Sequence, residues 1–224
     1  MNLLLGSVKV GKIFGVEVKI HNTLFIFFLL SVFSDGIVMA STLFPIIFGS
    51  VLFHEFAHVL QARKFGIHCH GVVLSPIGGV AMLEMPRIPK GEFLIAFIGP
   101  VSSFFLAFMS LLFIKLLMFF GISLDAENPH LLLTISLVSF KINLMLAVFN
   151  LLPIFPMDGG RMFRAALQIK FSFYRSTEIA VYFSKIAVFA FIFLGIYTIN
   201  PLLIFMAMFL FLCANQELRN VRGY

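Results

Sequence analysis

Apolar residues gather in six runs along the chain, and shorter polar or charged stretches separate them. A helix that crosses the hydrocarbon core of a bilayer needs about 20 residues. The middle four runs reach that length, whereas the first and the last are shorter. The runs are His21–Ser34, Met39–Ala62, Glu92–Phe120, Leu131–Leu152, Thr177–Ile199 and Pro201–Asn215. This pattern predicts six membrane-spanning helices.

Two further stretches do not have the pattern of a spanning helix. Val8–Ile20 consists of short alternating pieces broken by Gly11 and Gly15, which is typical of a β-hairpin. Val72–Met85 is apolar but is interrupted by a proline and a pair of glycines. At membrane depth the backbone of such segments must be hydrogen-bonded. We therefore expect both stretches to contribute to a small sheet.

The composition agrees with a membrane protein. Of the 224 residues, 61% are hydrophobic and only 12% are charged, and 31 are phenylalanine. An ordinary soluble domain carries roughly 25% charged residues. Much of the surface of a soluble fold of this length must face water, so it could not bury this much apolar side chain. Lipid is the natural solvent for these residues.

Positive charge alternates from one connection between the runs to the next. Of the 16 Lys and Arg residues, 13 lie before the first run, in the second or fourth connection, or after the last run. The other three connections contain neither Lys nor Arg. Cytoplasmic loops of membrane proteins are enriched in these residues. The alternation therefore predicts that both termini are cytoplasmic and that the number of spans is even.

Together these patterns predict an all-α protein of the cell membrane, with six transmembrane helices and a small β-sheet element near the cytoplasmic face. We expect residues 1–224 to form a single multi-pass core domain in the lipid bilayer. The formal net charge is +6. Because the cations do not gather on one polar face, this charge does not indicate nucleic-acid binding.

The second run contains two histidines and a glutamate in the pattern His54-Glu55-Phe56-Ala57-His58. Residues four apart share one face of a helix, so both imidazoles can point at one metal ion. A catalytic zinc takes nitrogen ligands of this kind and keeps a position for water, and Glu55 stands where it can accept a proton from that water. The alternative is a structural histidine pair bonded to backbone carbonyls. That alternative explains neither the spacing nor a carboxylate inside a membrane helix.

Asp158 is the acid best placed to supply a third zinc ligand. By the charge pattern it lies at the cytoplasmic end of the fourth run, on the same side as the end of the second run that carries His58. Pro153 and Pro156 break the helix before it, and the two glycines after it give the backbone freedom. Broken helices at membrane depth are tolerated where they line a protein cavity. The alternative is that Asp158 only caps a helix that begins near Gly159.

These two motifs resemble the site-2 protease family of intramembrane metalloproteases. In that family, a His-Glu-x-x-His motif on one membrane helix is completed by the aspartate of an Asn-x-x-Pro-x-x-Pro-x-Asp-Gly element on another, and here that element is Asn150–Gly159. Pro76–Ala81 and Gly99-Pro100 are also similar to family elements. Met157 departs from the pattern, since the family more often has leucine there.

The resemblance implies an intramembrane zinc metalloendopeptidase that hydrolyses peptide bonds in transmembrane segments of membrane-protein substrates. One Zn²⁺ per chain would be held by His54, His58 and Asp158, and Glu55 would be the catalytic base. Asn150 would bind the substrate or a developing oxyanion. The alternative for Asn150 is a polar contact between packed helices.

A membrane metal transporter or a zinc-binding channel is the alternative function. Such a protein would have ligating residues spaced through the membrane and some symmetry between its halves. This sequence has one compact ligand set and no internal repeat. His68, Cys69 and His70 follow the second run, and we interpret them as a solvated loop, since ligands one residue apart rarely converge on a structural zinc.

Overall fold

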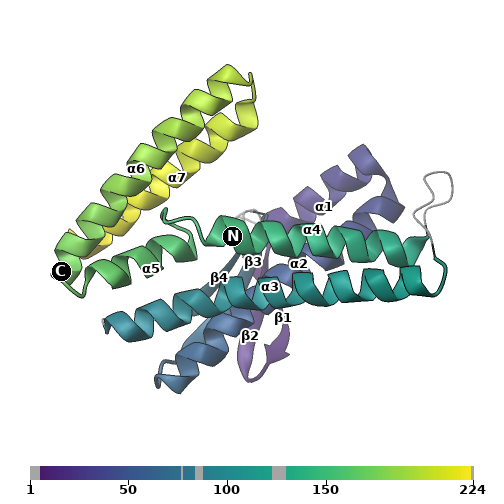
Figure 1. The fold of residues 1–224 in the computed structure, drawn as a ribbon, viewed down its shortest axis with the longest axis horizontal. Helices are drawn as coiled ribbons and strands as arrows, with labels where there is room; N and C mark the ends of the chain where they lie inside the picture. The colour runs from purple at the N-terminus through teal and green to yellow at the C-terminus, as the bar shows by residue number, and fades with distance from the viewer. Residues whose placement is uncertain (1–5, 77, 84–87, 123–129, 223–224) are drawn as a thin grey trace. The chain divides into compact units, whose positions relative to one another are not determined.

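The computed structural model describes residues 6–76, 78–83, 88–122 and 130–222. These residues form seven helices and four strands (Figure 1). The chain divides into two compact units. The first consists of Met1–Glu84 and Val101–Ala147, and the second of Met85–Pro100 and Val148–Tyr224. The helix α3 (Pro89–Phe119) therefore passes from the second unit into the first at Pro100.

The first unit contains a four-stranded sheet in which the strands follow the order β1-β2-β3-β4. β1 and β2 form an antiparallel hairpin, β2 and β3 are parallel, and β3 and β4 are antiparallel. Phe14 and Gly15 turn the first hairpin with positive φ angles of 49° and 79°, as a two-residue primed turn requires. The strands are Ser7–Ile13, Val16–His21, Cys69–Ser75 and Gly78–Leu83. The predicted hairpin and the small sheet are therefore confirmed.

The sheet packs against α2 (Ile37–Lys64), the helix that carries the two histidines. Alternate residues of β2 point to this helix, because side chains of a strand alternate between its two faces. Val16 and Val18 are buried together with Val72 of β3 and with Phe56 and Val59 of α2. Burying such apolar side chains stabilises a fold by roughly 1.5–3 kcal/mol each. This cluster fixes the rotation of α2 in the turns that carry the motif.

Polar contacts join the helices α2, α3 and α4 (Leu131–Asn150). The amide of Asn143 on α4 donates to Ser50 Oγ on α2 at 2.9 Å and to the carbonyl of Ser139 at 2.9 Å. The hydroxyls of Ser110 on α3 and Ser139 lie 3.0 Å apart. Small polar side chains often bond across membrane helices in this way. They connect α4 to α2 one turn before His54.

In the second unit, α6 (Phe173–Tyr197) and α7 (Pro201–Arg222) run side by side as a helical hairpin (Figure 1). Val188, Ala207 and Leu210 form the buried contact along this pair. The short helix α5 (Asp158–Leu167) packs on α6. Around Phe155, which is buried, the apolar side chains of α5, α6 and α7 form a second cluster: Phe163, Leu167, Ala180, Val181, Ala214 and Leu218.

Five of the described helices are long and apolar enough to cross a membrane, namely α2, α3, α4, α6 and α7. The chain is therefore a multi-pass membrane protein. The first run forms α1 (Asn22–Asp35), which has 14 residues and rises about 21 Å at 1.5 Å per residue. That rise is less than the roughly 30 Å of the hydrocarbon core. The prediction of six spans is therefore not confirmed as such, because α1 is a shorter apolar helix.

Candidate metal centre

His54 and His58 lie on consecutive turns of α2, and their rings are neighbours. The ring centroids are 4.8 Å apart, and the ring planes make an angle of 81°. Both side chains are buried, with 3% and 5% of their surface exposed. Two imidazoles that share a face at this spacing can bind one ion through one nitrogen each. The structure therefore agrees with the helical geometry on which the prediction of the two ligands rests.

Ser103 on α3 orients the first of these rings. Its hydroxyl lies 2.9 Å from His54 Nδ1, and Ser103 is fully buried. A ring N–H that donates to a hydroxyl oxygen leaves the lone pair on the other nitrogen, Nε2, as the metal-binding position. Ser103 could not be predicted from the sequence, because one serine in an apolar helix carries no local signal of its partner 49 residues away.

Glu55 is held by the strand β4. Its Oε2 accepts a hydrogen bond from the backbone N–H of Ala81 at 3.1 Å. The backbone of Gly79 lies directly against the same side chain, since a Cβ there would be 2.6 Å from Glu55 Cγ and 2.9 Å from Val51 Cγ1. Only glycine permits this approach. The stretch Pro76–Ala81, noted in the sequence for its paired glycines, therefore contributes β4 residues that orient the carboxylate of Glu55.

Asp158 is the first residue of α5 in the second unit, and it is buried. The residue at the N-cap is Met157, with φ −65° and ψ 158°, and it makes no side-chain capping hydrogen bond. The interpretation of Asp158 as the cap is therefore wrong. The helix α4 ends at Asn150, and a loop of irregular backbone with Pro153 and Pro156 follows. The predicted break before Asp158 is confirmed.

The two glycines after Asp158 are needed for close packing rather than for freedom of the backbone. A Cβ on Gly159 would lie 2.3 Å from the carbonyl oxygen of Leu152, and one on Gly160 would lie 2.8 Å from the backbone nitrogen of Phe155. Both glycines are helical, and neither has a positive φ. The start of α5 therefore rests directly on the preceding loop, which fixes the backbone that carries Asp158.

Asn150 is the last residue of α4 and is partly buried.

Cys69 and His70 belong to β3, so their interpretation as a loop was wrong. Burial raises the pKa of the Cys69 thiol, which donates to the carbonyl of Gly71. Because the thiolate is the form that binds metals, this thiol is a poor ligand.

The chemistry of these residues fits a zinc ion. His54 and His58 supply two buried nitrogen donors, one of them oriented by Ser103. The carboxylate of Asp158 is a donor type that zinc accepts as a third protein ligand. His54, Glu55 and His58 lie together in the first unit, whereas Asp158 and Asn150 belong to the second.

The chain is similar to known metalloproteases. The model of Peptidase family M50 matches residues 42–130 and 124–194. A zinc metalloprotease of Methanocaldococcus jannaschii, MJ0392, is 38% identical over 220 residues, which cover 96% of this chain and 61% of the relative. The putative zinc metalloprotease Rip3 of Mycobacterium tuberculosis is 31% identical over 178 residues, which cover 72% of this chain and 44% of the relative. The chain thus spans less than two thirds of these two relatives.

A solved structure has the same fold. The site-2 protease from Methanocaldococcus jannaschii matches with a TM-score of 0.69 and 34% sequence identity, covering 95% of each chain. The resemblance inferred from the two motifs is confirmed. Zinc is the metal named for these relatives, and the alternative of a metal transporter is not favoured.

We predict that Ser103→Ala weakens zinc binding by about 10- to 100-fold, the usual loss when a hydrogen-bond partner of a metal-binding histidine is removed. The dissociation constant can be measured by chelator competition on the purified protein. Ser110→Ala on the same helix is the control, because its hydroxyl contacts Leu106 and Ser139 and not a histidine. Equal zinc affinity of the two variants would contradict the role given to Ser103.

Proposed function

Because this chain belongs to Peptidase family M50, we propose that it is an intramembrane zinc metalloprotease. The observation that carries the proposal is the motif on α2. Two adjacent buried imidazoles lie beside Glu55, whose carboxylate is oriented by a backbone N–H of β4. An ionisable residue within a membrane helix is costly and marks a functional site. The zinc metalloproteases to which the chain is similar support the same activity.

Asp158 is the proposed third ligand of one zinc ion. Two histidines leave a catalytic zinc one protein ligand short. Asp158 is buried at the start of α5, is not the N-cap, and has a backbone packed tightly on the preceding loop. These features suit a carboxylate that must keep a fixed direction. In this proposal the two units act as a single catalytic domain, since each contributes ligands.

The proposed chemistry follows from the residues of the site. Zinc held by these residues would lower the pKa of a coordinated water and polarise the scissile carbonyl. Glu55 would accept a proton from the attacking water and pass it to the leaving amine. The hydrogen bond from Ala81 holds the carboxylate in one orientation for both transfers. Asn150 would bind the substrate backbone or the developing oxyanion.

The proposed substrate is a transmembrane segment of another membrane protein. The five apolar helices place the chain in the bilayer, where a soluble peptide does not accumulate. The carbonyls of a helical substrate are bonded within the helix, so the segment has to unwind locally before attack. Residues of low helix propensity near the cleaved bond favour that unwinding.

We predict that Glu55→Gln abolishes cleavage of a model membrane substrate and leaves zinc bound, because the proposed ligands remain. His54→Ala should lose both zinc and cleavage. The measurements are zinc content and substrate cleavage with the purified protein, before and after chelation. Cleavage by Glu55→Gln near the wild-type rate would show that another group accepts the proton.

We predict that Asp158→Asn weakens zinc binding severely and stops cleavage in a folded protein. Loss of a partly buried charge in the first turn of a helix costs up to about 2 kcal/mol, so the fold should survive. Asp35→Asn, a change at an exposed aspartate that ends α1, is the control. Full zinc occupancy in folded Asp158→Asn would exclude Asp158 as a ligand.

Both termini are proposed to be cytoplasmic, on the basis of the alternating Lys and Arg residues. In a protein whose Cys69 and Cys213 have been replaced, a cysteine at Val38 should react with an impermeant thiol reagent from outside the cell. Cysteines at Lys90 and Lys170 should react only after the membrane is opened. Reaction of the cysteine at position 90 from outside would contradict this orientation.

A further inference from the structure

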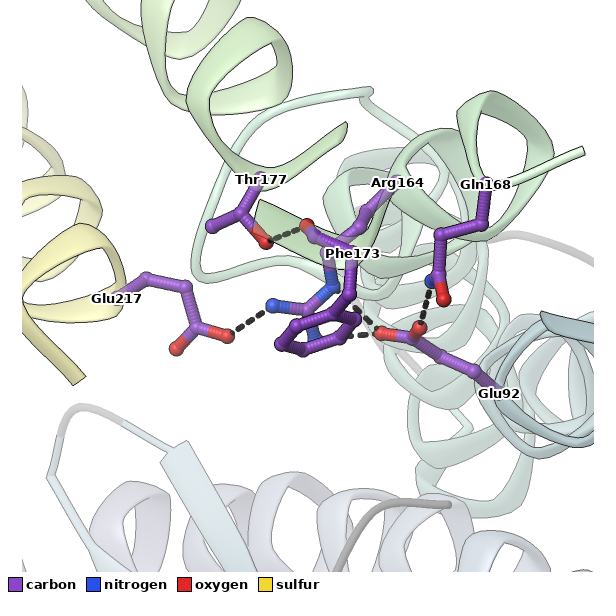
Figure 2. Close-up of polar contacts among 6 residues, drawn as sticks. All are labelled: Glu92, Arg164, Gln168, Phe173, Thr177 and Glu217. Carbon is purple, nitrogen blue, oxygen red and sulfur yellow. Dashed lines mark hydrogen bonds and ion pairs between the residues drawn. The ribbon is translucent and has the colours of Figure 1, made fainter. Parts of the chain in front are cut away.

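The second unit contains a buried cluster of charged residues around Arg164 (Figure 2). Arg164 Nε and Nη2 donate to Glu92 Oε1 at 2.7 and 2.5 Å, and Nη1 donates to Glu217 Oε1 at 2.5 Å. The amide of Gln168 donates to the other oxygen of Glu92 at 2.7 Å. The side chains of Arg164 and Glu92 are only 3% and 1% exposed. A buried ion pair offsets the cost of its desolvation only when nearly all of its donors and acceptors are hydrogen-bonded.

Through these contacts one guanidinium connects three helices. Glu92 lies in the first turn of α3, Arg164 is on α5, and Glu217 is near the end of α7. The fork of five N–H donors of arginine allows it to bond two carboxylates at once in fixed directions. The body of α5 is therefore fixed relative to α3 and α7 within this unit.

The same guanidinium also holds the loop before Asp158. It lies over the rings of Phe155 and Phe173, 5.1 and 4.9 Å from their centroids. Phe155 is 2% exposed, and its backbone N–H donates to Ser184 Oγ on α6 at 2.9 Å. Phe155 lies three residues before Asp158, and its backbone nitrogen packs against Gly160, where a Cβ would be only 2.8 Å away. Arg164 is thus part of α5 and also contacts the loop that leads into this helix.

We propose that Arg164 is a positioning residue for Asp158. By fixing both the loop before Asp158 and the helix after it, the guanidinium sets the direction of the carboxylate toward the metal. This inference rests on the proposed function, in which Asp158 is a zinc ligand. Nothing in the reaction requires a charge at Arg164 itself. A change at Arg164 is therefore expected to lower the affinity for the metal, and to lower the cleavage rate only as a result.

The test separates this role from simple support of the fold. The double variant Glu92→Gln/Arg164→Met removes both fully buried charges together and leaves only the partly exposed carboxylate of Glu217 without its partner. A buried ion pair replaced in this way often leaves stability unchanged. We expect the double variant to unfold, without metal, near the wild-type temperature. Its dissociation constant for zinc, from chelator competition, should rise about 10- to 100-fold.

Two single variants keep the proposal falsifiable if the double variant does not fold. Arg164→Lys keeps the charge but lacks the planar fork, so it should restore folding and leave zinc binding weak. Glu217→Gln removes the partly exposed partner and should also weaken zinc binding. Its matched control is Glu178→Gln, which removes the carboxylate from the exposed Arg175–Glu178 ion pair of the same unit.

Wild-type zinc affinity in the folded double variant, or in both single variants, would overturn the role of Arg164. Failure of the proposed function has a different signature. In that case Asp158→Asn itself would bind zinc as tightly as the wild-type protein, and the premise of the inference would be lost. Weak zinc binding in Asp158→Asn together with normal binding in the Arg164 variants would refute the inference alone.

Discussion

A polar group in the apolar interior of this protein must find its partner within the chain, because neither lipid nor packed helices supply water. Three side chains among the described residues illustrate this constraint. His54 is bonded to Ser103, Glu55 to the backbone of Ala81, and Arg164 to Glu92. Each partner comes from another element, so each bond also fixes how two elements meet. The hydrogen bonds that offset the cost of burying these polar groups therefore also fix the orientations of their side chains.

The two units use different means to hold their part of the proposed centre. In the first, the apolar face of the sheet covers α2, and the glycine at position 79 lets β4 reach Glu55. In the second, α5 has too few residues to be stable by itself, and it is fixed by tight contact at Gly159 and by the ion pairs of Arg164. A short helix held at both ends gives Asp158 little freedom.

Much of the fold and of the centre could be predicted from the sequence, because the signals are local. Long apolar runs predict the helices of the membrane, and the spacing of His54 and His58 predicts their common face. The partners were missed for the opposite reason: Glu92 and Arg164 are 72 residues apart, and His54 and Ser103 are 49 apart. No local pattern links such pairs. The role of Gly159 was misread because a glycine in a helix and one in a turn look alike in sequence.

The parallel pairing of β2 with β3 has a consequence for the path of the chain through the bilayer. Between these strands the chain runs out along α1 and returns along α2. Val18 pairs with Val72, and Ile20 with Leu74, so the chain returns to the depth at which it left the sheet. However deep α1 reaches, the excursion between the two strands must cross the bilayer an even number of times or not at all. The pairing of the two strands thus requires that α1 and α2 together make an even number of crossings, whatever the length of α1.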